Sequence, residues 1–492
     1  MVAVTASQSQ CNFAFARGVG SADRPPIRCA SVFYHDHMPF VRRLFVIALT
    51  CALAALPVPL LAQRSGSSPV LATAPAAAQG VNGHLDPDVA TRAYLATLPS
   101  DKKAKSDAYF EGGYWLILWD FVITAAVYLV LLATGLSARM RNSAERVAKS
   151  PTLQSVYYGA LFIVVTTVVT LPWTIYEGYV REHSYELSNL TFGAWLGEQA
   201  KGFAVSIVIG VLSIAVLYAI VRKLPRTWWV WGALAGVAFA FLGLVVGPVL
   251  ITPIFNSPTK LADARVVDPI LRLARQNGIP ATDVWEIDAS KQSKRISANV
   301  SGAMGTERIT LNDNLLNRAS LEEIEAVMGH EMGHYVLNHV YKETMEFGIL
   351  IVIAFAVVAW LFERLRVRYE ATWQIRGIGD PAGLPLLMLL FAAYSFLITP
   401  VSNTLTRTAE YEADVFGLNT ARQPDGFAQI AIKLSEYRKL DPGPWEEKIF
   451  FDHPSGRTRI FTAMRWKAEN LEPASGTSGA TTPSASSASG NP

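Results

Sequence analysis

Six long apolar stretches alternate with polar segments between residues 114 and 400. They lie at 114–136, 153–176, 202–221, 228–254, 345–362 and 383–400. Each approaches or exceeds the roughly 20 residues that an α-helix needs to cross the hydrocarbon core of a bilayer. Tryptophan stands at several of their ends, as at Trp115, Trp173 and Trp228, and this is typical of membrane–water interfaces. The pattern predicts a mainly α-helical, polytopic membrane protein, with four membrane helices in 114–256 and two in 345–402.

Two polar segments, 257–344 and 403–470, interrupt and follow the apolar stretches. The first opens with a helical pattern over 268–279, which a glycine and a proline end. Three short runs with strand character follow, at 283–288, 297–302 and 307–313. We therefore expect a small α+β domain outside the bilayer, attached to the membrane helices.

The N-terminal residues contain a further apolar run. Residues 38–62 begin at Met38, continue with Arg42 and Arg43 and then become apolar, which is the pattern of a secretory signal peptide. A retained first membrane helix is the alternative. Our hypothesis is that translation starts at Met38 and that residues 1–37 are an upstream artefact. Residues 63–113 then form an extramembrane segment, and the Ser-, Gly- and Ala-rich residues 471–492 a disordered tail.

Basic residues follow the first, third and fifth apolar stretches and therefore alternate onto one side of the membrane. They are Arg139, Arg141, Arg146, Lys149, Arg222, Lys223, Arg226, Arg364, Arg366, Arg368 and Arg376. The positive-inside rule assigns these loops to the cytoplasm. Both polar segments then face the periplasm of a bacterial inner membrane.

Composition agrees with a membrane protein and excludes several classes of chemistry. Charged residues make up 17% of the chain, against about 25% in soluble domains. The net charge of +3 is too small to indicate nucleic-acid binding. The cysteines are Cys11, Cys29 and Cys51, so the segments after residue 51 can have no disulfide and no thiolate ligand. A metal there must be held by histidines and carboxylates.

One stretch combines metal-binding and acid–base groups at helical spacing. Residues 330–334 read HEMGH, inside a helical pattern that starts with Ser320 and has Glu323 three residues later, a capping box. On a helix, His330 and His334 share a face and can bind one ion. Glu331 lies one step round the helix and can act as a base on water. The spacing predicts a zincin-type zinc site, although the bare pattern also arises by chance.

A catalytic zinc usually has three protein ligands and one open position. The third ligand is expected to be a carboxylate, and TRTAEYEADVFG, directly after the sixth apolar stretch, offers Glu410, Glu412 and Asp414. The alternative is that these carboxylates are simply exposed on a solvated helix.

HEMGHYVLNH and RTAEYEAD together resemble the type I CAAX prenyl protease family of integral-membrane zinc metallopeptidases. Further similar stretches extend from about Leu98 to Arg465 and include PVLITPIFN, GTERITLNDNLL and FDHPSGRTR. The resemblance implies a barrel of transmembrane helices around a large chamber, with zinc at one end.

The resemblance also implies roles for individual residues. It makes His330, His334 and Glu410 the zinc ligands, a gluzincin-like set, and Glu331 the general base. Asp414 matches a residue that orients a zinc-bound histidine through its second nitrogen. Glu412 occupies a variable position, where we expect it to be solvated.

Four more residues near these motifs are candidates. His453 and Arg459 match positions near the active site and could donate hydrogen bonds to an oxyanion; the alternative is that His453 and Pro454 begin the last helix. Arg407 could brace Glu410 by an ion pair or have a purely structural role. His339 lies about 140° round a helix from His334 and is expected to be structural rather than a ligand.

One departure bears on the substrate. Where the family has an Asn-Ala-Tyr edge strand, this chain has Ser297-Ala298-Asn299. Strand addition uses main-chain groups, so peptide binding can survive the change, whereas side-chain specificity for a prenylated substrate is weakened. We expect a zinc metalloendopeptidase that acts on peptides or proteins in membrane quality control. The alternatives are a CAAX prenyl-peptide endopeptidase, and a transporter or scaffold with a closed structural zinc site.

Overall fold

The computed structural model describes residues 74–80, 84–301 and 307–471, all within one compact unit. The predicted upstream segment 1–37, the signal-like segment 38–62 and the tail from residue 472 onward lie outside the described residues.

Five helices in the described residues are long and apolar enough to cross a membrane. They are α3 (Ser100–Ala133), α5 (Pro151–Ile175), α7 (Phe192–Lys223), α13 (His339–Arg368) and α15 (Leu384–Ala421). The remaining predicted stretch, 228–254, forms the 23-residue apolar helix α8 (Trp228–Leu250). All six predicted apolar stretches are thus helical.

Shorter helices connect and flank these elements. They are α2 (Pro87–Leu95), α4 (Leu136–Val147), α6 (Glu182–Ser184), α9 (Thr252–Phe255), α10 (Ala264–Gln276), α11 (Asp313–Arg318), α12 (Leu321–Val336), α14 (Glu370–Trp373), α16 (Pro424–Leu434), α17 (Pro444–Phe450) and α18 (Gly456–Asn470). Single turns complete the set: η1 (Ala76–Gln79), the π-helical η2 (Tyr176–Arg181), η3 (Ala289–Lys291) and η4 (Pro381–Gly383).

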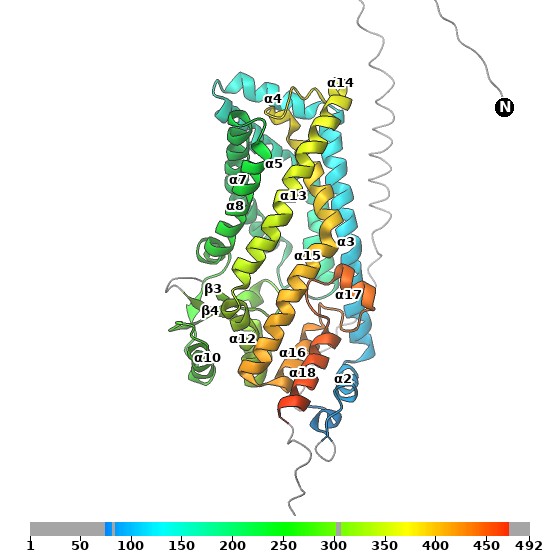
Figure 1. Ribbon diagram of the computed structural model, residues 1–492, viewed down its shortest axis with the longest axis vertical. Helices are drawn as coiled ribbons and strands as arrows, with labels where there is room; N and C mark the ends of the chain where they lie inside the picture. The colour runs from blue at the N-terminus through cyan, green and yellow to red at the C-terminus, as the bar shows by residue number, and fades with distance from the viewer. Residues whose placement is uncertain (1–73, 81–83, 302–306, 472–492) are drawn as a thin grey trace, which may run out of the picture. The chain divides into compact units, whose positions relative to one another are not determined.

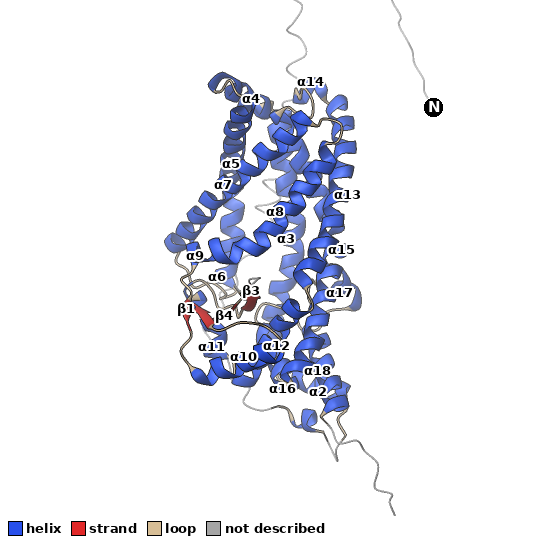
Figure 2. Cartoon of the chain, turned by 60° about the vertical axis from the view of Figure 1, so that its left-hand side comes forward, coloured by secondary structure: helices blue, strands red, loops and turns tan. Residues whose placement is uncertain are grey.

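The long helices separate two ends of the unit. Figure 1 shows α4 and α14 at one end and α2, α10, α12, α16 and α18 at the other, and Figure 2 shows the same separation from another side. The basic residues of α4 and of the last turn of α13 therefore lie at the end opposite α12.

A small sheet lies beside α12 (Figure 2). Its strand order is β1-β2-β4-β3, from β1 (Thr259–Lys260), β2 (Val284–Ile287), β4 (Arg308–Asn312) and β3 (Ala298–Ser301). The pair β2–β4 is parallel, and the outer pairs are antiparallel. Ile309 and Leu311 of β4 share a buried cluster with Met328 and Met332 of α12. The sheet thus packs on α12, and β3 forms the edge opposite β1.

The sequence signals for the start of α12 are confirmed. Ser320 Oγ accepts from the backbone N–H of Glu323, and Glu323 Oε2 accepts from that of Ser320 at 2.7 Å. Glu323 is fully buried and also pairs with Lys433 of α16 at 2.5 Å. Because an unpaired buried charge is costly, this pair fixes the start of the helix against α16.

Helices α12 and α15 approach closely because small residues line their contact. A Cβ on Gly333 would lie 3.1 Å from Ala413 Cα, and one on Gly329 would lie 3.0 Å from the carbonyl oxygen of Gly417. The two glycines of α12 and the small residues of α15 therefore let the backbones meet, as small residues do in close helix pairs. This contact brings the second motif next to the first.

Replacing Gly417 by Ala is expected to push the helices apart, because its Cβ would lie 2.7 Å from the backbone nitrogen of His330. Overpacking of this kind costs about 1–3 kcal/mol, and we expect loss of bound zinc together with a lower unfolding temperature. Gly197→Ala on α7 is the control, since nothing lies within 4 Å of its Cβ. Equal zinc content and equal unfolding temperatures in the two variants would contradict this packing.

Candidate active site

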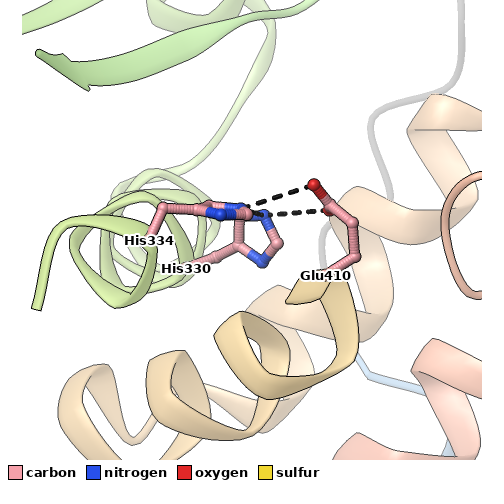
Figure 3. Close-up of side chains that lie close together, drawn as sticks. All are labelled: His330, His334 and Glu410. Carbon is pink, nitrogen blue, oxygen red and sulfur yellow. Dashed lines mark hydrogen bonds and ion pairs between the residues drawn. The ribbon is translucent and has the colours of Figure 1, made fainter. Parts of the chain in front are cut away.

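The three predicted ligands come together between α12 and α15. Figure 3 shows the rings of His330 and His334 on one helix facing the carboxylate of Glu410 on the other. Glu410 Oε2 lies 3.3 Å from His330 Nε2, and Oε1 lies 3.4 Å from His334 Nε2. The two Nε2 atoms are 3.1 Å apart. One donor atom from each residue lies within 4.8 Å of the others.

This donor set fits a catalytic zinc ion. Two imidazole nitrogens and one carboxylate are the ligands of His₂Glu zinc enzymes, which leave a position open for water. His330 and Glu410 are buried, whereas the His334 side chain is one-quarter exposed. Among the described residues, the metal-binding group has three members, so the four protein ligands of a closed structural site are not present there.

Asp414 lies behind His330. Its Oδ1 is 2.8 Å from His330 Nδ1, the ring nitrogen that faces away from Glu410. Burial alone would lower the pKa of His330, but Asp414 and Glu410 outweigh burial and raise this pKa to about 10. A metal must therefore displace a proton to bind Nε2, which couples metal affinity to pH.

Arg459 of α18 reaches both carboxylates. Its Nη2 donates to Glu410 Oε2 at 3.0 Å, and its Nε lies 3.0 Å from Asp414 Oδ2. The guanidinium is thus at the site, as the sequence predicts, and it balances the charge of the two carboxylates and holds them in place.

Arg407 does not brace Glu410 by an ion pair, which was one of its two predicted roles. Its guanidinium donates to the carbonyl oxygens of Glu447 and Phe451 and to Thr404 Oγ1. Among the described residues it makes no ion pair with Glu410. Arg407 therefore links α15 to α17. This is the purely structural role that the sequence left open for it.

His453 lies in the loop between α17 and α18 and faces the metal ligands. Its Nε2 is 3.3 Å from Glu410 Oε2, and its Nδ1 is 2.8 Å from Asp452 Oδ1. The alternative that His453 caps the last helix is wrong, because the N-cap of α18 is Ser455. Burial lowers the pKa of His453 below its ordinary value, although Asp452 raises it.

Glu331 and the metal-binding group line a cleft of about 530 Å³. Burial raises the pKa of the Glu331 carboxyl above its ordinary value, although the two histidines lower it. Ser297 and Ala298, at the start of the edge strand β3, line the same cleft, as do Arg295, Tyr437 and Arg438. The last three could not be predicted from the sequence, because no motif or spacing relates them to HEMGH.

Two further expectations concern the surroundings of His334. Glu412, expected to be solvated, is 41% exposed but pairs with Lys342 at 2.7 Å and with His339 at 3.1 Å. His339 does not join the metal-binding group. Its Nδ1 instead lies 3.0 Å from His334 Nδ1.

Comparisons with known proteins agree with this site. A model of peptidase family M48 matches residues 260–467, and one described as "CAAX prenyl protease N-terminal, five membrane helices" matches residues 90–257. The uncharacterized metalloprotease YhfN of Bacillus subtilis is 32% identical over 339 residues, which are 68% of this chain and 79% of that protein. The chain belongs to peptidase family M48. It is therefore a membrane metalloprotease, and the His/His/Glu group is its candidate zinc site.

More distant M48 relatives extend the similarity to the whole architecture. CAAX prenyl protease 1 of Saccharomyces cerevisiae is 26% identical over 338 residues, covering 65% of this chain and 74% of that protein. The crystal structure of S. mikatae Ste24p matches with a TM-score of 0.62 at 23% identity, covering 75% of this chain and 89% of that one. The structural likeness shows the fold, which is the expected polytopic helical chamber with a small catalytic domain.

Proposed function

We propose that this M48 protein is an endopeptidase that hydrolyses peptide bonds of membrane and periplasmic proteins in a quality-control role. One observation carries the proposal: a three-ligand metal-binding group, a partly buried glutamate and the end of a sheet edge line one cleft. When bound, zinc would polarise the scissile carbonyl and make the attacking water more acidic.

Glu331 is the proposed general base. It adjoins the ligand His330 on α12 and lines the cleft, so it can take the proton of the attacking water and give it to the leaving amine. Its raised pKa suits this role, because a base whose pKa lies closer to the working pH can both accept and release the proton.

His453 is the proposed hydrogen-bond donor to the oxyanion that forms at the scissile carbonyl. The ring faces the cleft from the side of α18, while α12 supplies Glu331. Nδ1 of His453 can donate its proton to Asp452, and Nε2 of the neutral ring then carries none. When the ring is protonated, Nε2 gains a proton and becomes a hydrogen-bond donor. Arg459 assists by holding the carboxylates of Glu410 and Asp414.

The edge of β3 is the proposed binding surface for the substrate backbone. Within the described sheet, β3 pairs with β4 on one side only, so its other side can accept an extended peptide by strand addition. Ser297 and Ala298 lead into β3 along the wall of the cleft. Strand addition uses the main-chain N–H and C=O groups of β3, so it does not depend on which side chains occupy residues 297–299.

Replacing His453 by Phe is expected to lower kcat by roughly 100- to 1,000-fold, the usual cost of losing one oxyanion donor. Zinc content should not change, because His453 is not a ligand in the proposed site. Steady-state kinetics on a quenched fluorescent peptide, with zinc measured on the same sample, checks this. An unchanged kcat would remove His453 from the mechanism.

The bacterial inner membrane, with the cleft on the periplasmic side, is the proposed location. Its support is that the basic residues of α4 and the end of α13 lie at the end opposite α12, and basic residues mark the cytoplasmic side. In a variant without cysteines, we expect an impermeant maleimide to label Asp441→Cys in intact spheroplasts and Arg139→Cys only after lysis. The reverse labelling would invert the topology.

A proteome-wide comparison tests the function itself. Membranes from cells with the wild-type protein should contain new N-termini that are missing from cells with Glu331→Gln. We expect these cleavage sites in unprenylated membrane and periplasmic proteins. Identical sets of N-termini in the two strains would overturn the proposal.

Prenylated peptides are the second candidate class of substrate. The observation that favours them is the similarity to proteins named CAAX prenyl protease 1. Purified protein given a farnesylated peptide and an unprenylated misfolded membrane protein side by side separates the two classes. Cleavage of the farnesylated peptide alone would favour the second.

A further inference from the structure

Arg438 lies on the wall of the catalytic cleft beside His453 and Arg459, in the segment between α16 and α17. Its side chain is half-buried, and its backbone carbonyl accepts from Ser106 Oγ at 3.2 Å. Within the described parts of the chain, its guanidinium has neither a hydrogen bond nor an ion pair. A group with several N–H donors thus borders the cleft, and no group of the described residues accepts from it.

The neighbouring cations are all paired. Arg295, also on the cleft wall, lies 2.8 Å from Glu182 Oε2. Arg459 is held by Glu410 and Asp414. Lys439, next to Arg438 in the chain, lies 2.6 Å from Glu111 and 2.7 Å from Glu446. Among the described residues, Arg438 is therefore the cation of the cleft that lacks an anionic partner.

The surroundings of Arg438 favour an incoming anion. Burial and the nearby charge of Arg459 both lower the pKa of Arg438, although Asp452 and Glu410 partly compensate. A partly desolvated charge is stabilised when an anion pairs with it. A carboxylate matches the planar guanidinium best, because it can accept two parallel hydrogen bonds.

We propose that Arg438 binds a carboxylate of the substrate, an inference that rests on the proposed peptidase function. The carboxylate can come from the C-terminus of the substrate or from an Asp or Glu side chain near the scissile bond.

Three related peptides distinguish the two sources of the carboxylate. They are a peptide with a free C-terminus, the same peptide as its C-terminal amide, and that amide with one Gln near the scissile bond changed to Glu. We expect the wild type to prefer the free acid or the Glu-containing amide over the plain amide. Arg438→Gln should raise KM for the preferred peptide by roughly 10- to 100-fold. Its kcat and zinc content should change little, and Arg438→Lys should recover part of the affinity.

Lys439→Gln is the matched control and should keep the preference, because Lys439 is paired elsewhere. Equal KM values of the wild type for all three peptides would overturn the role of Arg438 while leaving the peptidase function intact. A preference that persists in Arg438→Gln would also overturn it. Failure of the wild type to cleave any peptide would instead count against the proposed function.

A second observation, independent of the first, concerns the metal ligand His334. Its Nε2 faces Glu410, while its Nδ1 lies 3.0 Å from Nδ1 of His339. His339 is 1% exposed, and its Nε2 lies 3.1 Å from Glu412 Oε2. Lys342 donates to both oxygens of Glu412. Four side chains therefore form one chain of contacts that runs from the metal-binding group to the surface.

The order of the protons along this chain follows from the geometry. If His334 binds metal through Nε2, its proton is on Nδ1 and is donated to Nδ1 of His339. The proton of His339 is then on Nε2 and is donated to Glu412. The geometry points to His339 as a positioning residue that fixes the tautomer and ring orientation of His334. Asp414 occupies the corresponding place behind His330.

Two substitutions at His339 test this role. Phe fills the buried space without hydrogen bonds, whereas Asn can still accept from His334 Nδ1. We expect His339→Phe to increase the rate of zinc loss to a chelator by roughly 10- to 100-fold and to shift the visible spectrum of the cobalt-substituted protein. The rate of zinc loss and the spectrum of His339→Asn should lie closer to those of the wild type. Tyr341→Phe is the control, because Tyr341 is exposed on the same helix, and it should behave like the wild type.

Glu412→Leu tests the same chain of contacts from the surface and serves as the second variant if His339→Phe does not fold. Its rate of zinc loss is expected to lie between those of the wild type and His339→Phe. Rates and spectra equal to those of the wild type in His339→Phe, or in Glu412→Leu where the first does not fold, would overturn this role.

Discussion

Changing Glu331 to Gln is expected to leave zinc bound and to reduce peptide hydrolysis by roughly 100- to 10,000-fold, the range attributed to general acid–base catalysis. Glutamine has nearly the same size and keeps one carbonyl oxygen, but it cannot accept a proton from water at neutral pH. Because Glu331 is not a member of the metal-binding group, the ligands should be undisturbed. The measurement is kcat/KM on a quenched peptide, with zinc determined on the same sample.

The dependence of activity on pH adds a second signature of Glu331. Burial raises its pKa above the ordinary carboxyl value of 4.5. A base works only when deprotonated, so activity should fall as the pH drops through a value above 4.5, and residual activity of Glu331→Gln should lack this step. Zinc content must be followed in parallel, because protonation of the ligands can release the metal.

Glu322→Gln is the matched control, since Glu322 is exposed in the first turn of the same helix. It should keep wild-type activity. Full activity of purified Glu331→Gln with zinc bound would rule out the proposed mechanism.

The helix with His330 and His334 could be predicted because all its signals are local. The capping box of Ser320 and Glu323 fixes its start, and positions four apart share a face whatever the rest of the chain does. Glu410 could be selected among three neighbouring carboxylates only through the family resemblance, because it lies 76 residues beyond His334.

The structure supplies the physical reason for that choice among the carboxylates. Glu410 and Asp414 are four residues apart on α15 and face α12 together, where they contact His330. Glu412, two residues from each, is rotated by about 200° and therefore meets Lys342 and His339 of α13. No local signal says which face of α15 packs against which helix, so the contacts of Glu412 with Lys342 and His339 could not be predicted.

Arg407 shows the same limit. Three residues separate it from Glu410, which allows an ion pair on a helix. Carbonyl oxygens of α17 and the loop after it capture the guanidinium instead. That docking depends on contacts between segments about 40 residues apart, which sequence spacing does not encode.

The apolar run at 44–61 remains a prediction with two alternatives. The matching family model is described as having five membrane helices, whereas residues 90–257 contain four: α3, α5, α7 and α8. Residues 44–61 lie before the matched range, so the match leaves both alternatives open. The mass of the mature N-terminus distinguishes the two.

Replacing Glu410 by Ala is expected to abolish both zinc binding and hydrolysis. The substitution removes one of three ligand groups and also takes from Arg459 one of its two anionic partners, because its Nη2 lies 3.0 Å from Glu410 Oε2 and its Nε lies 3.0 Å from Asp414 Oδ2. The positive charge beside the site is then less fully balanced. That charge opposes a divalent cation. We therefore expect a larger loss of zinc affinity than the roughly 10- to 100-fold typical for the partners that orient a ligand.

Chelation followed by zinc titration provides the measurement. The wild type should lose activity with its zinc and regain it on titration, whereas Glu410→Ala should regain neither at the same zinc concentration. The double variant Glu410→Ala/Arg459→Ala should bind zinc more tightly than Glu410→Ala, because the repelling charge is gone, yet stay inactive. If Glu410→Ala instead kept wild-type zinc affinity, the third ligand would have to be sought elsewhere in the chain, and the proximity of Glu410 to the two histidines would reflect charge pairing alone.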